Sequence, residues 1–199
     1  MAYSLTPWGY EVDGGLPPII DVDDFNSMTG GRYAADERVE YAIDAATAAI
    51  RAYCGWHVAP MTSCRATLDG ELGDIWLPCV ALRSVTSVTY GGTQQTVTGF
   101  NRHGRVRTQA PQPTGGLGNV TVDYLAGFDV ATTPDLANVI CERVVAEIAR
   151  GAYGVTSESA GGVSVSYGGS ALSDAGGAFL PESTRAALMA YRLVKSHVA

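Results

Sequence analysis

The stretch VEYAIDAATAAIRAYCGWHVAP, residues 39–60, decides the fold of this chain. Apolar side chains recur along it at spacings of four and three: Val39, Ile43, Ala46, Ile50 and Tyr53. This recurrence places them on one face, so the stretch predicts a surface helix that buries a single stripe. Gly55 follows and is suited to the left-handed conformation that ends many helices.

The composition is that of an ordinary globular domain. Of 199 residues, 46% are hydrophobic and 17% are charged, which provides a core and argues against wholesale disorder. No apolar run approaches the length of a membrane span, and the first residues lack the basic and apolar layout of a signal peptide. We therefore expect a protein that is made and kept in a cytoplasm, with no membrane partner.

The formal charge is −7, with 20 acidic against 13 basic residues. This balance argues against a protein whose affinity comes from holding phosphates, but it is compatible with one that surrounds nucleic acid without gripping it. The four cysteines show no paired CxxC spacing. Scattered thiols in a reducing compartment predict buried side chains without disulfides.

The first 20 residues predict an extended arm. Prolines and glycines interrupt any period there, yet Trp8, Tyr10 and residues 16–20 make the arm too apolar for a free tail. We expect it to lie along a neighbouring surface of another copy or of a partner. Asp21 then fits the N-cap of a short helix over residues 22–28.

After Pro60 the sequence changes to short segments rich in valine, threonine and aromatics, separated by glycine-containing turns. These segments predict strands at residues 62–68, 75–77, 84–90, 94–100, 105–108 and 120–124. In the last of them, Val120, Val122 and Tyr124 alternate with polar residues, as in a half-buried strand. Residues 62–125 therefore predict a small antiparallel β module.

A second helical part follows at residues 132–193. Thr133 and Pro134 suit the start of one helix, which Gly151 ends, and Pro181 suits the start of another. The intervening glycine- and serine-rich residues 154–177 predict a flexible loop, and residues 192–199 form a C-terminal tail. With the helical residues 21–60, this order predicts one α+β unit over residues 1–199: a small helical bundle with an inserted antiparallel β module.

Cys54 and His57 are candidates for chemistry. With Cys64 they superficially suggest zinc, but a second close pair of ligands is absent, and packing is the simpler interpretation. As nucleophile and base, Cys54 and His57 would make the chain a small cytoplasmic hydrolase or thiol enzyme, an alternative that stays open here. The acids of one glycine turn do not match a calcium loop: Asp69, Glu71 and Asp74. We predict no metal site and no cofactor.

One basic cluster lies on a predicted hairpin and contains Arg102, His103, Arg105 and Arg107. A solvated strand edge explains it, because charged edges discourage pairing with other sheets. The alternatives are contact with a DNA backbone, contact with an acidic partner ring, or a binding module that recognises a ligand through residues 102–107.

The segment AAIRAYCGWHVAP, residues 48–60, resembles the head–tail connector (adaptor) proteins of long-tailed bacteriophages. Three further stretches follow the same pattern in the same order. They are Leu77-Pro78 leading into LRSVTSV at 82–88, then VDYLAGF at 122–128, then the loop 158–167 followed by residues 188–193. The resemblance extends over residues 20–193, nearly the whole chain.

This resemblance implies a structural, non-enzymatic component of the virion neck that is assembled in the host cytoplasm. It implies a homo-oligomeric ring, a dodecamer, beneath the portal protein and above a stopper or tail-completion protein. Double-stranded DNA would pass through the ring without being bound tightly.

The resemblance also implies contact surfaces. The portal interface falls on the C-terminal helix and tail, at Pro181, Leu188, Tyr191, Arg192, Leu193 and Lys195. Contacts with the neighbouring subunit or the lumen fall on the loop, at Val163, Val165 and Tyr167. A further contact with a neighbour or the stopper falls on the hairpin, at Arg102, Arg105 and Arg107.

Overall fold

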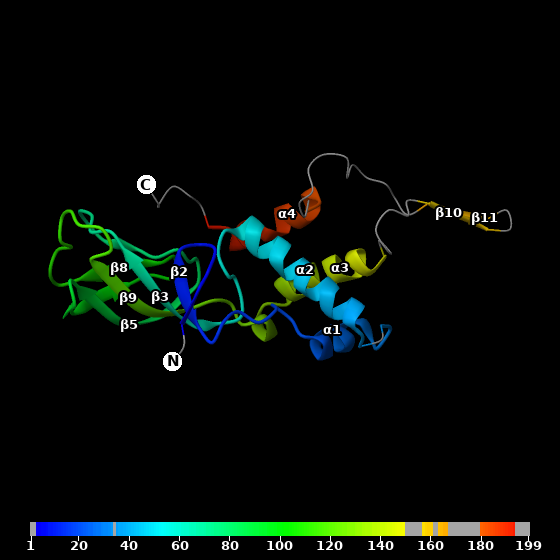
Figure 1. Cartoon of the computed structure of the whole chain (residues 1–199), viewed down its shortest axis with the longest axis horizontal. Helices are drawn as coiled ribbons and strands as arrows, with labels where there is room; N and C mark the ends of the chain where they lie inside the picture. The colour runs from blue at the N-terminus through cyan, green and yellow to red at the C-terminus, as the bar shows by residue number, and fades with distance from the viewer. Residues whose placement is uncertain (1–2, 34, 150–156, 161–162, 167–179, 194–199) are drawn as a thin grey trace. The chain divides into compact units, whose positions relative to one another are not determined.

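The computed structural model describes residues 3–33, 35–149, 157–160, 163–166 and 180–193. The chain divides into two compact units, which Figure 1 shows as ribbons. The β unit comes from segments 1–17, 54–133 and 189–199, and the helical unit from segments 18–53 and 134–188. None of the helices in the described ranges is both long and apolar enough to span a bilayer.

The helical unit carries four α-helices and one hairpin in its described residues. The helices are α1 (Val22–Thr29), α2 (Glu37–Cys54), α3 (Pro134–Ala149) and α4 (Glu182–Leu188). The hairpin pairs β10 (Ser157–Ala160) with β11 (Val163–Ser166). Val163 and Val165, predicted as loop contacts, are therefore strand residues, whereas Tyr167 lies outside the described residues.

Helix α2 confirms the prediction made from residues 39–60. Val39, Ile43, Ala46 and Ile50 are buried, as the spacing of four and three requires. The helix ends at Cys54, and Gly55 then takes a φ of 78°, a left-handed conformation that glycine adopts at little cost.

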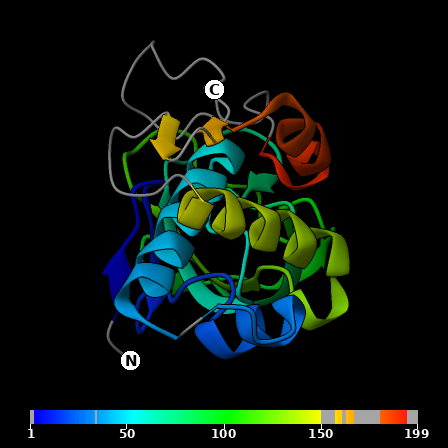
Figure 2. The ribbon, with the colours of Figure 1, turned by 90° about the vertical axis from the view of Figure 1, so that its right-hand side faces the viewer.

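Helices α2 and α3 cross each other (Figure 2). Close to the start of α2, Nη2 of Arg38 donates to the carbonyl oxygen of Ile148, near the end of α3, at 2.6 Å. Helix α3 buries Leu136, Ile140 and Val144, a stripe of every fourth residue that faces the interior. Four helices with antiparallel sheets confirm a mixed α and β class.

The β unit contains two antiparallel sheets. The six-stranded sheet has the order β1-β2-β3-β9-β5-β6, and the three-stranded sheet has the order β4-β8-β7. Their bounds are β1 (Tyr3–Leu5), β2 (Tyr10–Asp13), β3 (Thr62–Leu68), β4 (Ile75–Trp76), β5 (Leu82–Tyr90), β6 (Thr93–Gln94), β7 (Val97–Phe100), β8 (Arg105–Thr108) and β9 (Val120–Ala126). Two short 3-10 helices also belong to this unit, η1 (Val130–Thr132) and η2 (Met189–Tyr191).

Strand β9 lies inside the larger sheet, between β3 and β5. Its buried residues are Val120, Val122, Tyr124 and Ala126, which confirms the alternation seen in the sequence. The predicted bounds of β3 and β8 agree with the structure residue for residue. The module therefore follows directly from the period-two pattern after Pro60.

The N-terminal arm differs from the expectation of a segment laid on a neighbour. Residues 3–5 and 10–13 are extended, but they are strands β1 and β2 of the chain's own sheet. Strand β2 pairs with β3, with Val12 opposite Cys64, and the side chains of Tyr10 and Val12 are buried. The physical reason is that Tyr10 and Val12 alternate with charged residues over four positions, too short a run to stand out among prolines and glycines.

Candidate functional site

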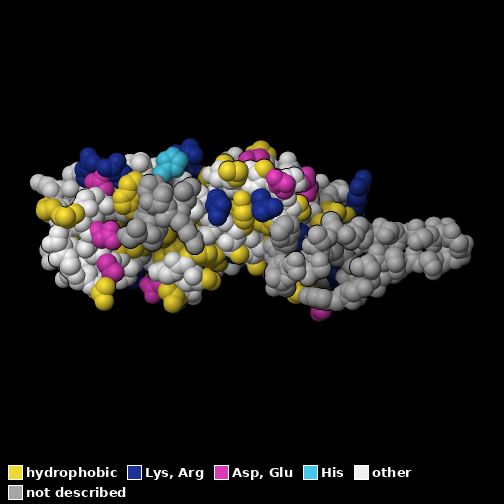
Figure 3. All heavy atoms as spheres, turned by 90° about the horizontal axis from the view of Figure 1, so that it is seen from above, with side chains coloured by type: hydrophobic (Ala, Val, Ile, Leu, Met, Phe, Trp, Pro, Cys, Tyr) yellow, Lys and Arg dark blue, Asp and Glu magenta, His cyan; other side chains and the backbone are white. Residues whose placement is uncertain are grey.

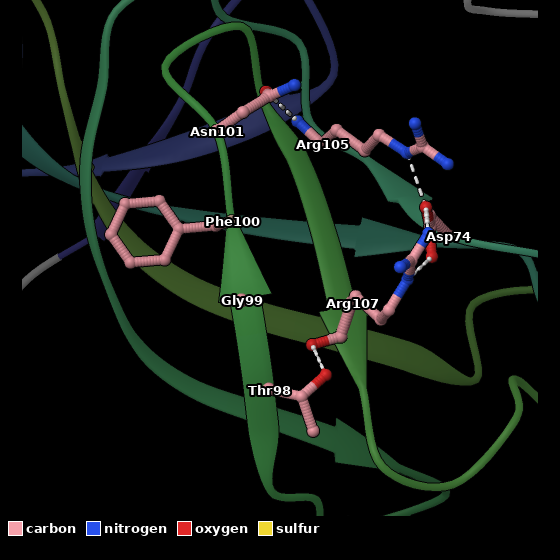
Figure 4. Close-up of a pocket in the computed structure, with 7 residues that line it drawn as sticks. All are labelled: Asp74, Thr98, Gly99, Phe100, Asn101, Arg105 and Arg107. Carbon is pink, nitrogen blue, oxygen red and sulfur yellow. Dashed lines mark hydrogen bonds and ion pairs between the residues drawn. The ribbon is translucent and has the colours of Figure 1, made fainter.

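The basic cluster of the hairpin is arranged around one carboxylate. Arg105 and Arg107 lie on β8 on either side of Val106, which is fully buried, so the two arginines share the opposite face of the strand. Asp74 lies just before β4, which pairs with β8. Its Oδ1 accepts from Nε of Arg107 at 2.8 Å, and its Oδ2 accepts from Nη2 of Arg107 at 2.9 Å and from Nε of Arg105 (Figure 4).

A hollow of about 240 Å³ lies beside this ion pair. Its remaining lining comes from β7 and the turn that follows: Thr98, Gly99, Phe100 and Asn101. Figure 4 shows the ring of Phe100 on one side of β7 and the two guanidinium groups on the other. Phe100 is 47% exposed, so the hollow has an apolar border and a cationic border.

The electrostatics of the hollow favour an anion. Hydrogen bonds from Arg107 and then Arg105 lower the pKa of Asp74, so the carboxyl stays ionised at neutral pH. The hydrogen bond to Asp74 in turn raises the pKa of Arg107. Two guanidinium groups against one carboxylate leave one net positive charge on a chain whose formal charge is −7.

The structure brings together only two of the three arginines predicted for the hairpin contact. Arg105 and Arg107 line the hollow, whereas Arg102 lies outside that lining, in the turn before β8. Figure 3 shows dark-blue arginine side chains and a cyan histidine along one margin of the β unit. The sequence missed Asp74, Gly99 and Phe100 as members of the site, because Asp74 is 31 residues from Arg105 and only strand pairing brings them together.

We predict that Asp74→Asn removes a pH-dependent part of the stability. The folded pKa of Asp74 is depressed, so its stabilisation is fully present above the ordinary value of 3.8 and is lost as the pH falls through the folded pKa. Urea midpoints of the parent and the variant should therefore differ near neutral pH, by the small amount typical of exposed ion pairs, and converge in acid. Glu71→Gln, an exposed carboxyl in the same loop, is the control and should show no such convergence.

Cys54 and His57 belong to the buried interior of the β unit. The Nδ1 atom of His57 lies 2.7 Å from the hydroxyl of Tyr10, and its Nε2 atom lies 3.1 Å from the carbonyl oxygen of Ala126. Because a carbonyl can only accept, Nε2 carries the proton and Nδ1 accepts from Tyr10. The same hydroxyl accepts from the backbone N–H of His57 at 3.0 Å, so both ring nitrogens are engaged structurally.

The thiol of Cys54 is a poor nucleophile. Burial raises its pKa to about 12, against a smaller opposing effect from Arg192. A thiol needs to ionise to react, and a reactive cysteine requires an electropositive, accessible site. The alternative of a thiol enzyme or hydrolase through Cys54 and His57 therefore has no support from this geometry.

The acidic turn is also accounted for by protein contacts. Asp74 is held by two arginines, and Oδ1 of Asp69 accepts from the backbone N–H of Gly118 at 2.7 Å. Across the ranges that the structure describes, no three His, Cys, Asp or Glu side chains gather to hold a metal ion.

The residues predicted for the portal interface divide between interior and surface. Leu188 and Tyr191 are buried, each within its own unit. Pro181 and Arg192 are exposed, Leu193 is half-buried, and Lys195 lies outside the described residues. The carbonyl of Tyr191 accepts from the indole N–H of Trp56 at 2.7 Å, and the N–H of Leu193 donates to the carbonyl of Cys54 at 2.8 Å. These bonds tie residues 189–193 to the β unit.

Comparison with known proteins gives one family. The sequence matches the family model described as head completion protein over residues 18–194. No curated protein matches it. A chain in the neck of the native GTA particle, computed with C12 symmetry, has the same fold, with a TM-score of 0.54 and 16% identity over 98% of this chain and 96% of that chain.

A chain in the neck of the empty GTA particle, computed with C6 symmetry, is similar, with a TM-score of 0.56 and 17% identity. The match covers 93% of this chain and 95% of that chain. The agreement over nearly the full length includes both the β unit and the helical unit. This chain therefore belongs to the head completion protein family, the structural connectors of the head–tail junction in tailed bacteriophages and similar particles.

Proposed function

We propose that this chain forms a homo-oligomeric ring, a dodecamer, in the neck of a virion, where it joins the portal protein to a stopper or tail-completion protein. The observation that carries the proposal is the match to the head completion protein family over residues 18–194. The similar chains come from necks computed with C12 and C6 symmetry, which supports a cyclic assembly of copies.

The charge of the chain supports a conduit for double-stranded DNA. Each phosphate that a protein neutralises adds to a salt-dependent grip, and a ring of subunits with a formal charge of −7 avoids that grip. DNA would then move through the channel during packaging and ejection without being held. No catalytic step is needed for this role, and assembly in the host cytoplasm follows from it.

In this proposal the helical unit and the β unit have different roles in the ring. The helical unit acts as the helical bundle of the ring, and the segment at Pro181 to Leu193, together with Lys195, contacts the portal. Exposed Pro181 and Arg192 are the described members available for that contact. The β unit, through Arg102, Arg105 and Arg107, contacts a neighbouring protein, and Val163, Val165 and Tyr167 contact the next subunit or the lumen.

Deletion of the gene for this chain from the genome that encodes the particle tests this function. We expect heads that fill with DNA but do not join tails, and restoration of tailed particles when the intact chain is supplied in trans. Electron microscopy of the purified chain mixed with portal should show an added ring on the portal. Tailed, infectious particles made without the chain would contradict the proposal.

A further inference from the structure

Neither the backbone conformation nor the packing within one chain requires a glycine at position 99, in strand β7. It is not among the glycines with a left-handed φ, and a Cβ built at this position meets no atom within 4 Å. The pairing of β7 with β8 shifts between Val97 and Gly99, but such a shift does not need glycine when φ is not left-handed. Glycine weakens a strand and often marks the place where another backbone approaches closely.

The open space above Gly99 is part of the hollow. Gly99 lies opposite Arg107 in the strand register, so a side chain at position 99 would lie beside that of Arg107. Strand β7 is the outer strand of its sheet, which leaves one backbone edge for an added extended segment. Asp74 holds the guanidinium groups of Arg105 and Arg107 in place on the neighbouring strand β8, ready for a second carboxylate.

A segment of this chain has the matching chemistry. Residues 69–74 and 112–119 form paired loops, joined by hydrogen bonds from Gly70 to Gly116, Gly115 to Gly70, Gly118 to Asp69 and Gln112 to Gly73. At their tips Leu72 is 86% exposed and Leu117 is 90% exposed, and the exposed Glu71 precedes Leu72. Large apolar side chains displayed on loops that are already ordered are typical of an interaction surface.

We propose that residues 70–73 of one copy dock in the hollow of the next copy. The carboxylate of Glu71 lies on Arg105 and Arg107, and Leu72 packs against Phe100. In an extended segment, neighbouring side chains such as those of Glu71 and Leu72 point to opposite sides. The cationic and apolar borders of the hollow likewise lie on opposite sides of β7 (Figure 4). This inference rests on the proposed ring.

The sheet order gives the contact a direction. Residues 70–73 come directly before Asp74, which lines the hollow on the β4 side, whereas the open space of the hollow lies across β8, over Gly99 of β7. A contact that joins two different surfaces of the same chain is heterologous, the type that forms a ring when the rotation between successive copies closes. DNA is the less fitting occupant, because one net positive charge, a glycine floor and a phenylalanine border suit a peptide better than a phosphate backbone.

Cross-linking of two proteins that each display one accessible cysteine tests the contact. Leu72→Cys and Gly99→Cys are made separately in a Cys141→Ser background, because Cys141 is half-buried while the other three native thiols are buried. The two proteins are mixed at equal concentration and treated with a short bismaleimide. We expect heterodimers in this mixture only. A mixture of Leu5→Cys and Gly99→Cys is the control, since Leu5 is equally accessible but lies on β1 of the other sheet.

Substitutions test the chemistry of the contact by sedimentation of the full chain over a concentration series. Gly99→Val fills the hollow without straining the strand and should weaken self-association by at least about tenfold, while Thr93→Val on the exposed strand β6 should not. Arg107→Glu should weaken it by a similar factor, and Arg107→Glu combined with Glu71→Arg should restore it. The urea midpoint of each variant confirms that the β unit is folded.

Two outcomes would overturn the inference and leave the proposed function intact. One is a ring on the portal whose assembly is unaffected by Gly99→Val and by the charge exchange, with no heterodimer from positions 72 and 99. The other is loss of retained DNA in Arg107→Glu particles with unchanged self-association, which would assign the arginines to DNA. Failure of the proposed function instead appears as tailed particles made in the absence of the chain.

Discussion

Replacing Trp56 with alanine lowers the free energy of unfolding of the β unit by about 3–5 kcal/mol, the usual cost of deleting a large buried aromatic side chain. Trp56 is fully buried and packs edge-on against His57 and Phe128, with ring centroids 5.0 Å and 6.0 Å apart. Its indole N–H also holds the carbonyl of Tyr191. The substitution therefore removes core volume and releases the segment that follows α4.

Urea unfolding followed by tryptophan fluorescence measures this loss. The three tryptophans of the chain, Trp8, Trp56 and Trp76, all belong to the β unit, so two remain as probes in the variant. Trp56→Phe is the matched control: it keeps most of the apolar contact but removes the hydrogen bond from the indole N–H to the Tyr191 carbonyl, at a cost of about 1–3 kcal/mol. A loss below about 1 kcal/mol in Trp56→Ala would show that the indole is not part of the core.

Tyr10→Phe is the second large effect that we expect. The hydroxyl of Tyr10 donates to Nδ1 of His57 and accepts from the backbone N–H of His57, at 2.7 Å and 3.0 Å. Removal of this one oxygen breaks both hydrogen bonds in the protein interior, and each loss costs about 1–3 kcal/mol. The ring itself stays, so the loss isolates the hydrogen bonds from the packing.

The Tyr10 variant also distinguishes the two interpretations of the N-terminal segment. If residues 3–13 belong to the chain's own sheet, Tyr10→Phe lowers the urea midpoint of the isolated chain. If they were an arm laid on a neighbour, it would affect assembly but not the isolated chain. Tyr3→Phe is the control for the same chemical change on β1, where Tyr3 contacts Arg65 through its ring, and should change the stability by less than about 0.5 kcal/mol.

A partly exposed charge pair in the larger sheet, between Arg65 and Asp123, follows the same logic as Asp74. Burial acts to raise the pKa of Asp123, but hydrogen bonds from Arg65 and Ser87 outweigh it and the pKa is lowered. The pair joins β3, β5 and β9 across the larger sheet. Charged residues at these positions therefore support the sheet.

Periodicity was sufficient for the longer helices and strands. Strands β3 and β8 and helix α2 were predicted within two residues at each end, because each carries a period that repeats several times. Strands β1 and β2 were missed, since a strand of three or four residues shows too few repeats to be distinguished from an irregular arm. The resemblance of residues 48–60 to connector proteins supplied the family, which the match over residues 18–194 confirms.

The sequence predicted only some of the residues of the candidate site. Arg105 and Arg107 stood out as a basic cluster in the sequence, but whether they were a solvated edge or a site depended on their surroundings. The sequence drew attention to Asp74 only as a possible calcium ligand and did not single out Gly99. Strand pairing places Asp74 against the guanidinium groups and Gly99 opposite Arg107. The roles of Cys54 and His57 were likewise open until burial and hydrogen bonding identified them as interior groups.

The sequence by itself determined the helices, most strands, the mixed class and the family, because these depend on local periodicity and on short stretches of similar residues. Only the tertiary structure decided which residues meet: that the N-terminal segment completes the sheet, that Trp56 ties down residues 189–193, and that two arginines share one aspartate beside an open glycine. The reason is that such contacts join residues 31 to 135 positions apart, and the energy that selects them comes from burial and hydrogen bonding in the folded chain.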